Sequence, residues 1–123
     1  MATAHTNLSE YDKELTPNAS EMSFGIVVSE WNGNITDNLL KGAYKALIDN
    51  GVLPANIIVK HTPGAYELPL AAQLLIENTK VDGVVAIGSV IQGETKHFDY
   101  VCEAVSQGIK DVNLKYGKPV AFC

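Results

Sequence analysis

Four short runs of apolar residues divide the chain after residue 20, and each is typical of a buried β-strand. Strands of a parallel sheet are covered on both faces, so they read as continuous apolar runs rather than as an alternation. The runs are Phe24–Val28, Ile57–Val59, Gly83–Ile87 with an extension towards Ile91, and Val120–Phe122. The pattern therefore predicts four strands that are spaced well apart along the chain.

Apolar residues between these runs recur every three or four positions, which predicts three amphipathic helices. Their apolar stripes are Leu39, Leu40, Ala43 and Leu47; then Leu68, Ala71, Ala72 and Leu75; then Phe98, Val101, Cys102, Val105, Ile109 and Val112. We expect Thr36 to cap the first helix and Gly51 to end it. Pro69 lies in the first turn of the second helix, where proline is favoured, and Gly117 ends the third.

This alternation of strands and helices predicts an α/β fold, because parallel strands need right-handed crossover connections. We expect a flavodoxin-like three-layer sandwich with a four-stranded parallel sheet of order 2-1-3-4. The first helix covers one face of that sheet, and the next two cover the other. Ligands of such sheets bind outside the carboxyl ends of the strands. The candidate loops are therefore Ser29–Thr36, His61–Glu67 and Ser89–His97.

The predicted domain covers residues 21–123, and the polar segment 1–20 is expected to be a mobile tail or an inter-subunit strand. The predicted sheet leaves one face bare over its third and fourth strands, although parallel strands are normally covered on both faces. Either another chain covers this face, or the polypeptide continues beyond Cys123. We expect continuation, with C-terminal helices of the domain missing from this sequence.

The composition indicates a soluble globular protein, with 46% hydrophobic and 19% charged residues. The formal net charge is −5 and every basic residue is a lysine, which argues against binding to nucleic acid or an anionic membrane. No stretch has the length or the pattern of a membrane span or a secretory signal. The two cysteines have no metal-ligand spacing. We therefore expect a cytoplasmic protein.

The third loop ends where a helix is expected to begin near Thr95, so backbone N–H groups there are free to bind an anion such as phosphate. His97 lies in the first turn, where an imidazole beside that anion can transfer protons. The alternative is that Thr95 only caps the helix and that His97 is a surface residue. From the residues alone, both interpretations stay open.

The other two loops carry an aromatic residue and a carboxylate. Trp31 follows the first strand, and its indole can stack on a flat heterocycle or fill a subunit interface. Glu67 follows a Pro63-Gly64 turn, so it either favours the helix dipole or binds a polar substrate. Tyr66 is more typical of a core or an interface than of a ligand contact.

These loops together resemble the 6,7-dimethyl-8-ribityllumazine synthase family over residues 23–123. The matching segments are Trp31-Asn32 with Ile35-Thr36, Leu40–Ala43, Pro63–Pro69, Ala86–Val101 and Pro119–Phe122. The long segment from Ala86 is specific. The resemblance therefore favours a functional His97 over the surface alternative.

The resemblance implies that the protein condenses 5-amino-6-(D-ribitylamino)uracil with 3,4-dihydroxy-2-butanone 4-phosphate in riboflavin biosynthesis. It implies proton transfer by His97, and neither a cofactor nor a metal, because positioning and proton transfer suffice for this reaction. Substrate-binding positions implied by the match are Trp31, Ala65, Tyr66, Glu67, Ser89, Val90, Ile91, Glu94, Thr95 and Phe122, the last of these serving a neighbouring subunit's site.

The family also implies partners, namely further copies of the chain in a pentamer or an icosahedral shell with sites between subunits, and riboflavin synthase. Two departures stand out: Gln92 replaces a basic residue common in relatives, and the arginine that relatives use to bind phosphate beyond the fourth strand has no counterpart here. The alternatives are a non-catalytic module that binds phosphate or a flavin-like ring, and a cage-forming scaffold.

Overall fold

A parallel four-stranded sheet forms the centre of the protein in a computed structural model that describes residues 10–123. Its strands are β1 (Phe24–Ser29), β2 (Ile57–Thr62), β3 (Gly83–Ile87) and β4 (Val120–Phe122). They lie in the order β2-β1-β3-β4, and every pair is parallel. The predicted order is confirmed. The third strand is shorter than expected, because its ladder with β1 ends at Ile87 and the chain then leaves the sheet.

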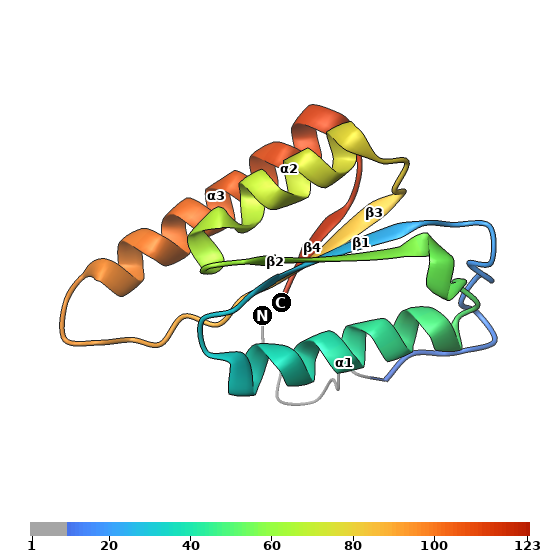
Figure 1. Ribbon diagram of the computed structural model, residues 1–123, viewed down its shortest axis with the longest axis horizontal. Helices are drawn as coiled ribbons and strands as arrows, with labels where there is room; N and C mark the ends of the chain where they lie inside the picture. The colour runs from blue at the N-terminus through green and yellow to red at the C-terminus, as the bar shows by residue number, and fades with distance from the viewer. Residues whose placement is uncertain (1–9) are drawn as a thin grey trace.

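Three helices cover the two faces of this sheet (Figure 1). They are α1 (Gly33–Asp49), α2 (Leu68–Asn78) and α3 (His97–Tyr116), with short 3-10 turns at Pro54–Asn56 and Ala65–Glu67. Helix α1 lies on one face, whereas α2 and α3 lie on the other. The three-layer α/β sandwich is therefore confirmed.

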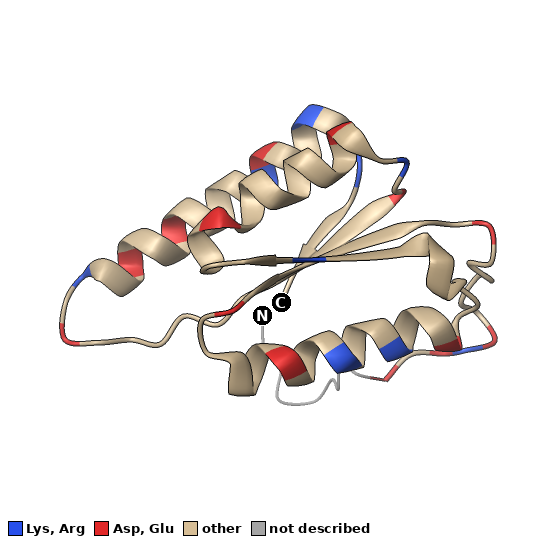
Figure 2. Ribbon diagram, viewed as in Figure 1, with Lys and Arg blue, Asp and Glu red and all other residues tan. Residues whose placement is uncertain are grey.

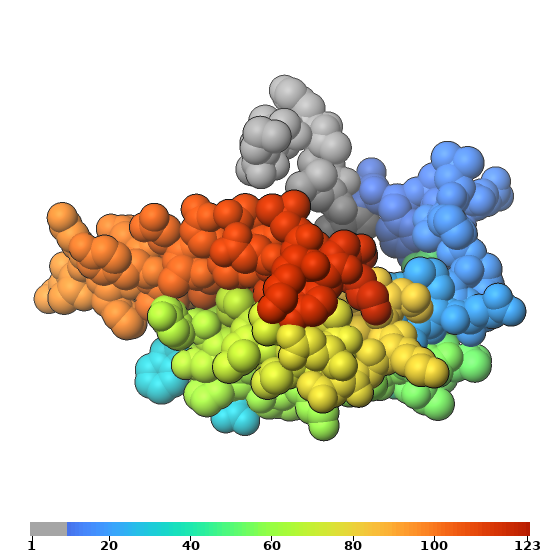
Figure 3. Space-filling model, turned by 90° about the horizontal axis from the view of Figure 1, so that it is seen from above, coloured from blue at the N-terminus to red at the C-terminus, as the bar shows by residue number. Residues whose placement is uncertain are grey.

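The larger core lies beneath α2 and α3, which run side by side (Figure 3). Leu68 of α2, Ala86 of β3 and Val105 of α3 are fully buried there. The two helices approach closely at Gly108, where an added Cβ would lie 2.6 Å from Cγ of Pro69. Only glycine fits between α3 and the rigid proline ring, so this position sets the spacing of the helix pair.

The smaller core lies beneath α1, where Ile26, Val28 and Ile87 of the sheet meet the apolar stripe of the helix. Charged residues lie mainly on the helices and loops, and β1 and β3 carry none (Figure 2). Ala121 of β4, which pairs with Val85, is exposed. The expectation that further chain follows Cys123 stays a prediction.

Thr36 does not cap α1, which corrects the sequence-based expectation. The helix begins at Gly33 after Asn32, so Thr36 lies inside its first turns and is fully buried. Its hydroxyl donates to the carbonyl of Ser29 over 2.8 Å. A threonine hydroxyl does bond a backbone group here, but that group is the carbonyl at the end of β1 rather than an N–H group at the start of the helix. The expected helix ends are confirmed, with Gly51 at φ 97° and Gly117 at φ 60°.

The described part of the amino-terminal segment packs against the end of α1. The Ala19 N–H donates to the carbonyl of Asn50 over 2.9 Å, and the Ala19 side chain is buried. Asn50 Nδ2 also donates to the hydroxyl of Tyr11 over 3.2 Å. Residues 1–9, on which part of the tail prediction falls, lie outside the described residues. The proposed roles of this segment stay predictions.

The far ends of α2 and α3 are joined by a hydrogen bond from the Tyr116 hydroxyl to the Glu77 carboxylate. This bond lowers the pKa of Glu77 below its usual value, with a smaller contribution from Gln73. Partial desolvation and the same bond raise the pKa of Tyr116.

None of the helices between residues 10 and 123 combines the length and the apolar character that a membrane span requires.

Candidate active site

A pocket of about 570 Å³ opens at the carboxyl ends of β1, β2 and β3, on the side of the sheet that α3 covers. The loops after these three strands and the start of α3 supply its walls. Its lining residues are Trp31, Pro63, Gly64, Ala65, Tyr66, Glu67, Ser89, Val90, Ile91, His97, Tyr100 and Val101. The pocket therefore lies where parallel α/β sheets usually bind ligands.

Trp31 forms one wall of the pocket, and its backbone is held by the neighbouring loop. The Trp31 N–H donates to the carbonyl of Pro63 over 3.2 Å, and the Glu30 N–H donates to the carbonyl of Thr62 over 2.8 Å. The side chain is 72% exposed. A large apolar ring on a fixed backbone is suited to stacking on a flat ligand.

The turn after β2 is closed by two side chains. The Thr62 hydroxyl donates to the carbonyl of Gly64 over 2.8 Å, and Glu67 Oε2 accepts the Gly64 N–H over 3.0 Å. Ala65 is buried against the core, whereas Tyr66 is exposed. One carboxylate oxygen of Glu67 thus holds the turn, and the other has no protein partner in the described residues. That oxygen can accept a hydrogen bond from a ligand hydroxyl.

The segment after β3 forms the opposite wall. Ser89 and Val90 are half-buried and Ile91 is exposed. Asn32 Nδ2 donates to the carbonyl of Ser89 over 2.8 Å. The peptide groups of this segment lie along the pocket, where their N–H and C=O groups can pair with the edge of a heterocycle.

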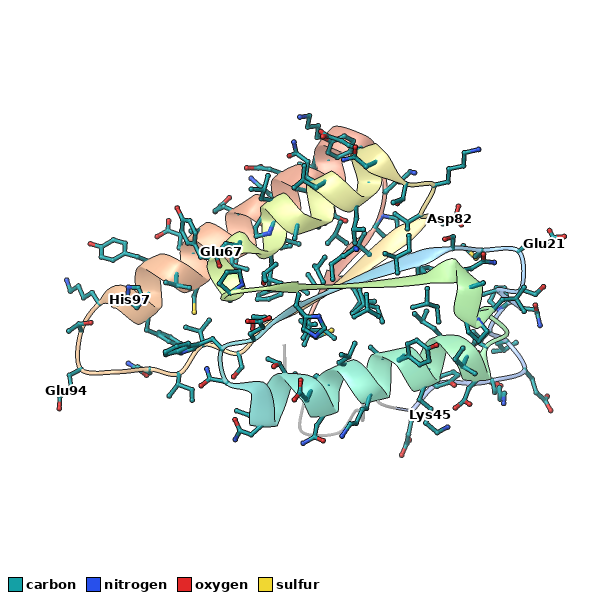
Figure 4. The ribbon with its side chains drawn as sticks, in the orientation of Figure 1. Glu21, Lys45, Glu67, Asp82, Glu94 and His97 are labelled. Atoms are coloured by element: carbon teal, nitrogen blue, oxygen red, sulfur yellow. The ribbon has the colours of Figure 1, made fainter. Side chains whose placement is uncertain are left out.

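His97 is the first residue of α3, and its exposed side chain lines the pocket. The helix starts later than the sequence predicted: Lys96 is the N-cap, and the Thr95 hydroxyl accepts the His97 N–H over 3.4 Å. Figure 4 shows His97 at the left end of α3, where the helix begins, and Glu67 on the neighbouring 3-10 turn Ala65–Glu67. The His97 imidazole therefore lies at one edge of the pocket, at the start of a helix.

The pocket brings together eight of the residues singled out from the sequence: Trp31, Ala65, Tyr66, Glu67, Ser89, Val90, Ile91 and His97. Glu94, Thr95 and Phe122 are not among its lining residues. Glu94 lies on the exposed bend before α3 and points away from the molecule (Figure 4). Phe122 lies on β4 opposite Ala86 and is exposed.

Tyr100 and Val101 line the pocket and were missed as site residues. They follow His97 by three and four positions, so they share its side of the helix. That spacing is visible in the sequence, but Val101 also belongs to the apolar stripe of the helix, which by itself indicates a core position. Within residues 10–123 no cluster of three or more His, Cys, Asp or Glu side chains could hold a metal ion.

Comparison with known proteins yields one consistent description. A family model described as 6,7-dimethyl-8-ribityllumazine synthase matches residues 21–123. A relative of that name from Flavobacterium johnsoniae is 55% identical over 123 residues, which are 100% of this chain and 65% of the relative. Relatives of the same name from Parabacteroides distasonis and Christiangramia forsetii are 53% and 52% identical, over 99% and 100% of this chain and 76% and 74% of their own lengths. The chain thus spans about two thirds to three quarters of the length of these curated relatives.

Proposed function

The chain belongs to the 6,7-dimethyl-8-ribityllumazine synthase family, and on this basis we propose that the protein makes that lumazine in riboflavin biosynthesis. The substrates are 5-amino-6-(D-ribitylamino)uracil and 3,4-dihydroxy-2-butanone 4-phosphate, and phosphate and water are released. The observation that carries the proposal is that Trp31 and His97 line the same pocket. These residues lie 66 positions apart in the sequence.

The pocket offers a separate set of groups for each part of the pyrimidine substrate. Trp31 stacks on the uracil ring, and the peptide groups of Ser89, Val90 and Ile91 pair with its polar edge. The ribityl chain extends towards Ala65–Glu67, where the free carboxylate oxygen of Glu67 accepts a hydroxyl. Holding a flat ring and a polyol in one orientation is the main requirement for a condensation of two substrates.

His97 moves protons during imine formation and loss of phosphate. Its imidazole lies on the first turn of α3, and the start of a helix favours a bound anion through its dipole and its backbone N–H groups. We place the phosphate near the bend that contains Glu94 and Thr95, which precedes this turn. The reaction then needs a proton donor and acceptor close to the leaving group, and histidine suits both roles near neutral pH.

In this proposal, Phe122 contributes to the pocket of a neighbouring subunit rather than to the pocket of its own chain. It is exposed on β4 and does not line the pocket of the same subunit. In a homo-oligomer, pentameric or arranged as an icosahedral shell, it completes the site of a neighbour. Riboflavin synthase, which would consume the product, is the further partner, and the cytoplasm is the proposed location.

An activity assay tests the proposal directly. Both substrates are mixed with the protein that contains this chain, and formation of the lumazine is followed by its absorbance. We expect turnover that depends on both substrates. Tight binding of the lumazine without turnover would instead indicate a binding module, and a cage that neither binds nor turns over would indicate a scaffold.

Replacement of Trp31 by alanine is expected to raise the KM for the pyrimidine substrate roughly tenfold or more. Stacking of a base on an aromatic side chain contributes about 1–3 kcal/mol, and the exposed indole has little part in the core. Trp31→Phe is the matched control, since it keeps an aromatic face and should retain most of the affinity. Steady-state kinetics with each substrate varied in turn measure the effect. An equal loss in both variants would contradict stacking.

A further inference from the structure

We propose that Asn32 is a positioning residue that holds the Trp31 wall of the pocket and the Ser89–Ile91 wall at a fixed separation. The inference rests on the proposed function, because it assigns the two walls to one substrate ring. Asn32 does not line the pocket. It acts through its side-chain bond to the Ser89 carbonyl.

The backbone of Asn32 has an unusual conformation that turns the chain from β1 into α1. Its φ and ψ are 62° and 45°, and it is the one residue other than glycine with positive φ among residues 10–123. Asparagine tolerates this left-handed region better than most residues do. Its carbonyl accepts the N–H groups of Ile35 and Thr36 over 2.9 and 3.1 Å. The main chain of Asn32 therefore starts the helix without help from its side chain.

The side chain serves the loop after β3 instead. Asn32 makes no side-chain cap bond to α1. Its amide spans 57 positions of sequence to reach the Ser89 carbonyl at 2.8 Å. The Asn32 side chain therefore does not cap α1, because its amide donates to the loop after β3 instead.

The wall that receives this bond has few other attachments. In the described part of the chain, the Asn32 amide makes the only hydrogen bond to any residue from Ser89 to Gly93. The preceding residue, Gly88, is tied to Cys123 on the other side of β3. Without the amide, no hydrogen bond among residues 10–123 would hold the segment that faces the substrate ring, and the contact of Val90 with the core would be its main attachment.

The opposite wall is fixed by the main chain. The Trp31 N–H is bonded to Pro63 in the loop after β2, so the main chain of Trp31 is attached to the β2 side of the pocket rather than to the Ser89 segment. The strand order places β1 between β2 and β3. The loop containing Trp31 and Asn32 therefore links all three sides of the pocket, and the Asn32 side chain is its connection to the β3 side.

Two variants separate the side chain from the backbone conformation. Asn32→Gly adopts the left-handed conformation without strain and lacks the amide. Asn32→Asp keeps the shape but places a carboxylate oxygen against the Ser89 carbonyl. We expect both to unfold near the native midpoint, because no core contact or helix cap is lost.

We expect Asn32→Gly to raise the KM for the pyrimidine substrate about fivefold with a smaller change in kcat, which is the scale of one hydrogen bond. Asn32→Asp should lose more at pH 8. Its lumazine affinity relative to the native protein should recover as pH falls, because a protonated carboxyl regains a donor. Fluorescence titration with the lumazine at several pH values measures this ratio.

Backbone NMR order parameters give a readout that needs no substrate. We expect lower values for residues 89–93 in Asn32→Gly than in the native protein. Native order parameters in both variants, or native KM and lumazine affinity, would overturn the positioning role. If the native protein neither forms nor binds the lumazine, the proposed function alone is contradicted. The order parameters would still decide whether Asn32 holds the Ser89 segment.

Discussion

Replacement of His97 by asparagine is expected to lower kcat for lumazine formation about 100-fold, the lower range for loss of a general acid or base. Asparagine keeps a polar side chain at the start of α3 and can occupy the place of the Nδ1 atom, but it cannot bind and release a proton. Because the His97 side chain is exposed and makes no protein hydrogen bond among the described residues, the fold should not change. The KM values should therefore change less than kcat.

Glu103→Gln is the matched control for this variant. Glu103 lies on the same helix and is exposed, but it does not line the pocket. Its replacement should leave the rate unchanged. Single-turnover measurement of absorbance isolates the chemical steps from product release. Native kcat in His97→Asn would remove the imidazole from proton transfer and leave the anion-binding helix start as the sole contribution of this turn.

Replacement of Leu68 by alanine is expected to lower the free energy of unfolding by about 2–5 kcal/mol, as for other large-to-small changes in a close-packed core. Leu68 is 0% exposed and is the first residue of α2. Its Cδ1 lies beneath Gly88, where an added Cβ would approach it to 2.9 Å. The loss is a large part of the 5–15 kcal/mol typical of a native domain.

Leu114→Ala makes the same chemical change on a helix surface. Leu114 is 76% exposed, so its truncation should change stability by no more than about 0.5 kcal/mol. Chemical denaturation of both variants at one protein concentration gives the comparison. Equal losses would mean that Leu68 does not have the packing seen here. A cavity at Leu68 should also weaken lumazine binding, because Leu68 lies beside Gly88, which directly precedes the Ser89–Ile91 wall of the pocket.

The candidate site was predicted in part because its residues follow strands. The sequence placed Trp31, Glu67 and His97 in loops after three successive strands, and the carboxyl ends of parallel strands share one edge of the sheet. The same rule did not separate Glu94 and Thr95 from the pocket, because an exposed bend of several residues has no periodicity to fix its path. Their contribution to phosphate binding remains a prediction.

The sequence by itself determined the layers, the strand order and the edge of the sheet at which the pocket lies. Hydrophobic periodicity is a local signal, and the handedness of crossovers turns it into a topology with few alternatives. Only the tertiary structure decided that Thr36 bonds the end of β1 rather than capping α1, and that Asn32 connects two loops that lie 57 positions apart. A polar side chain bonds whichever partner folding brings within reach, so that choice is set by the whole fold rather than by its neighbours in sequence.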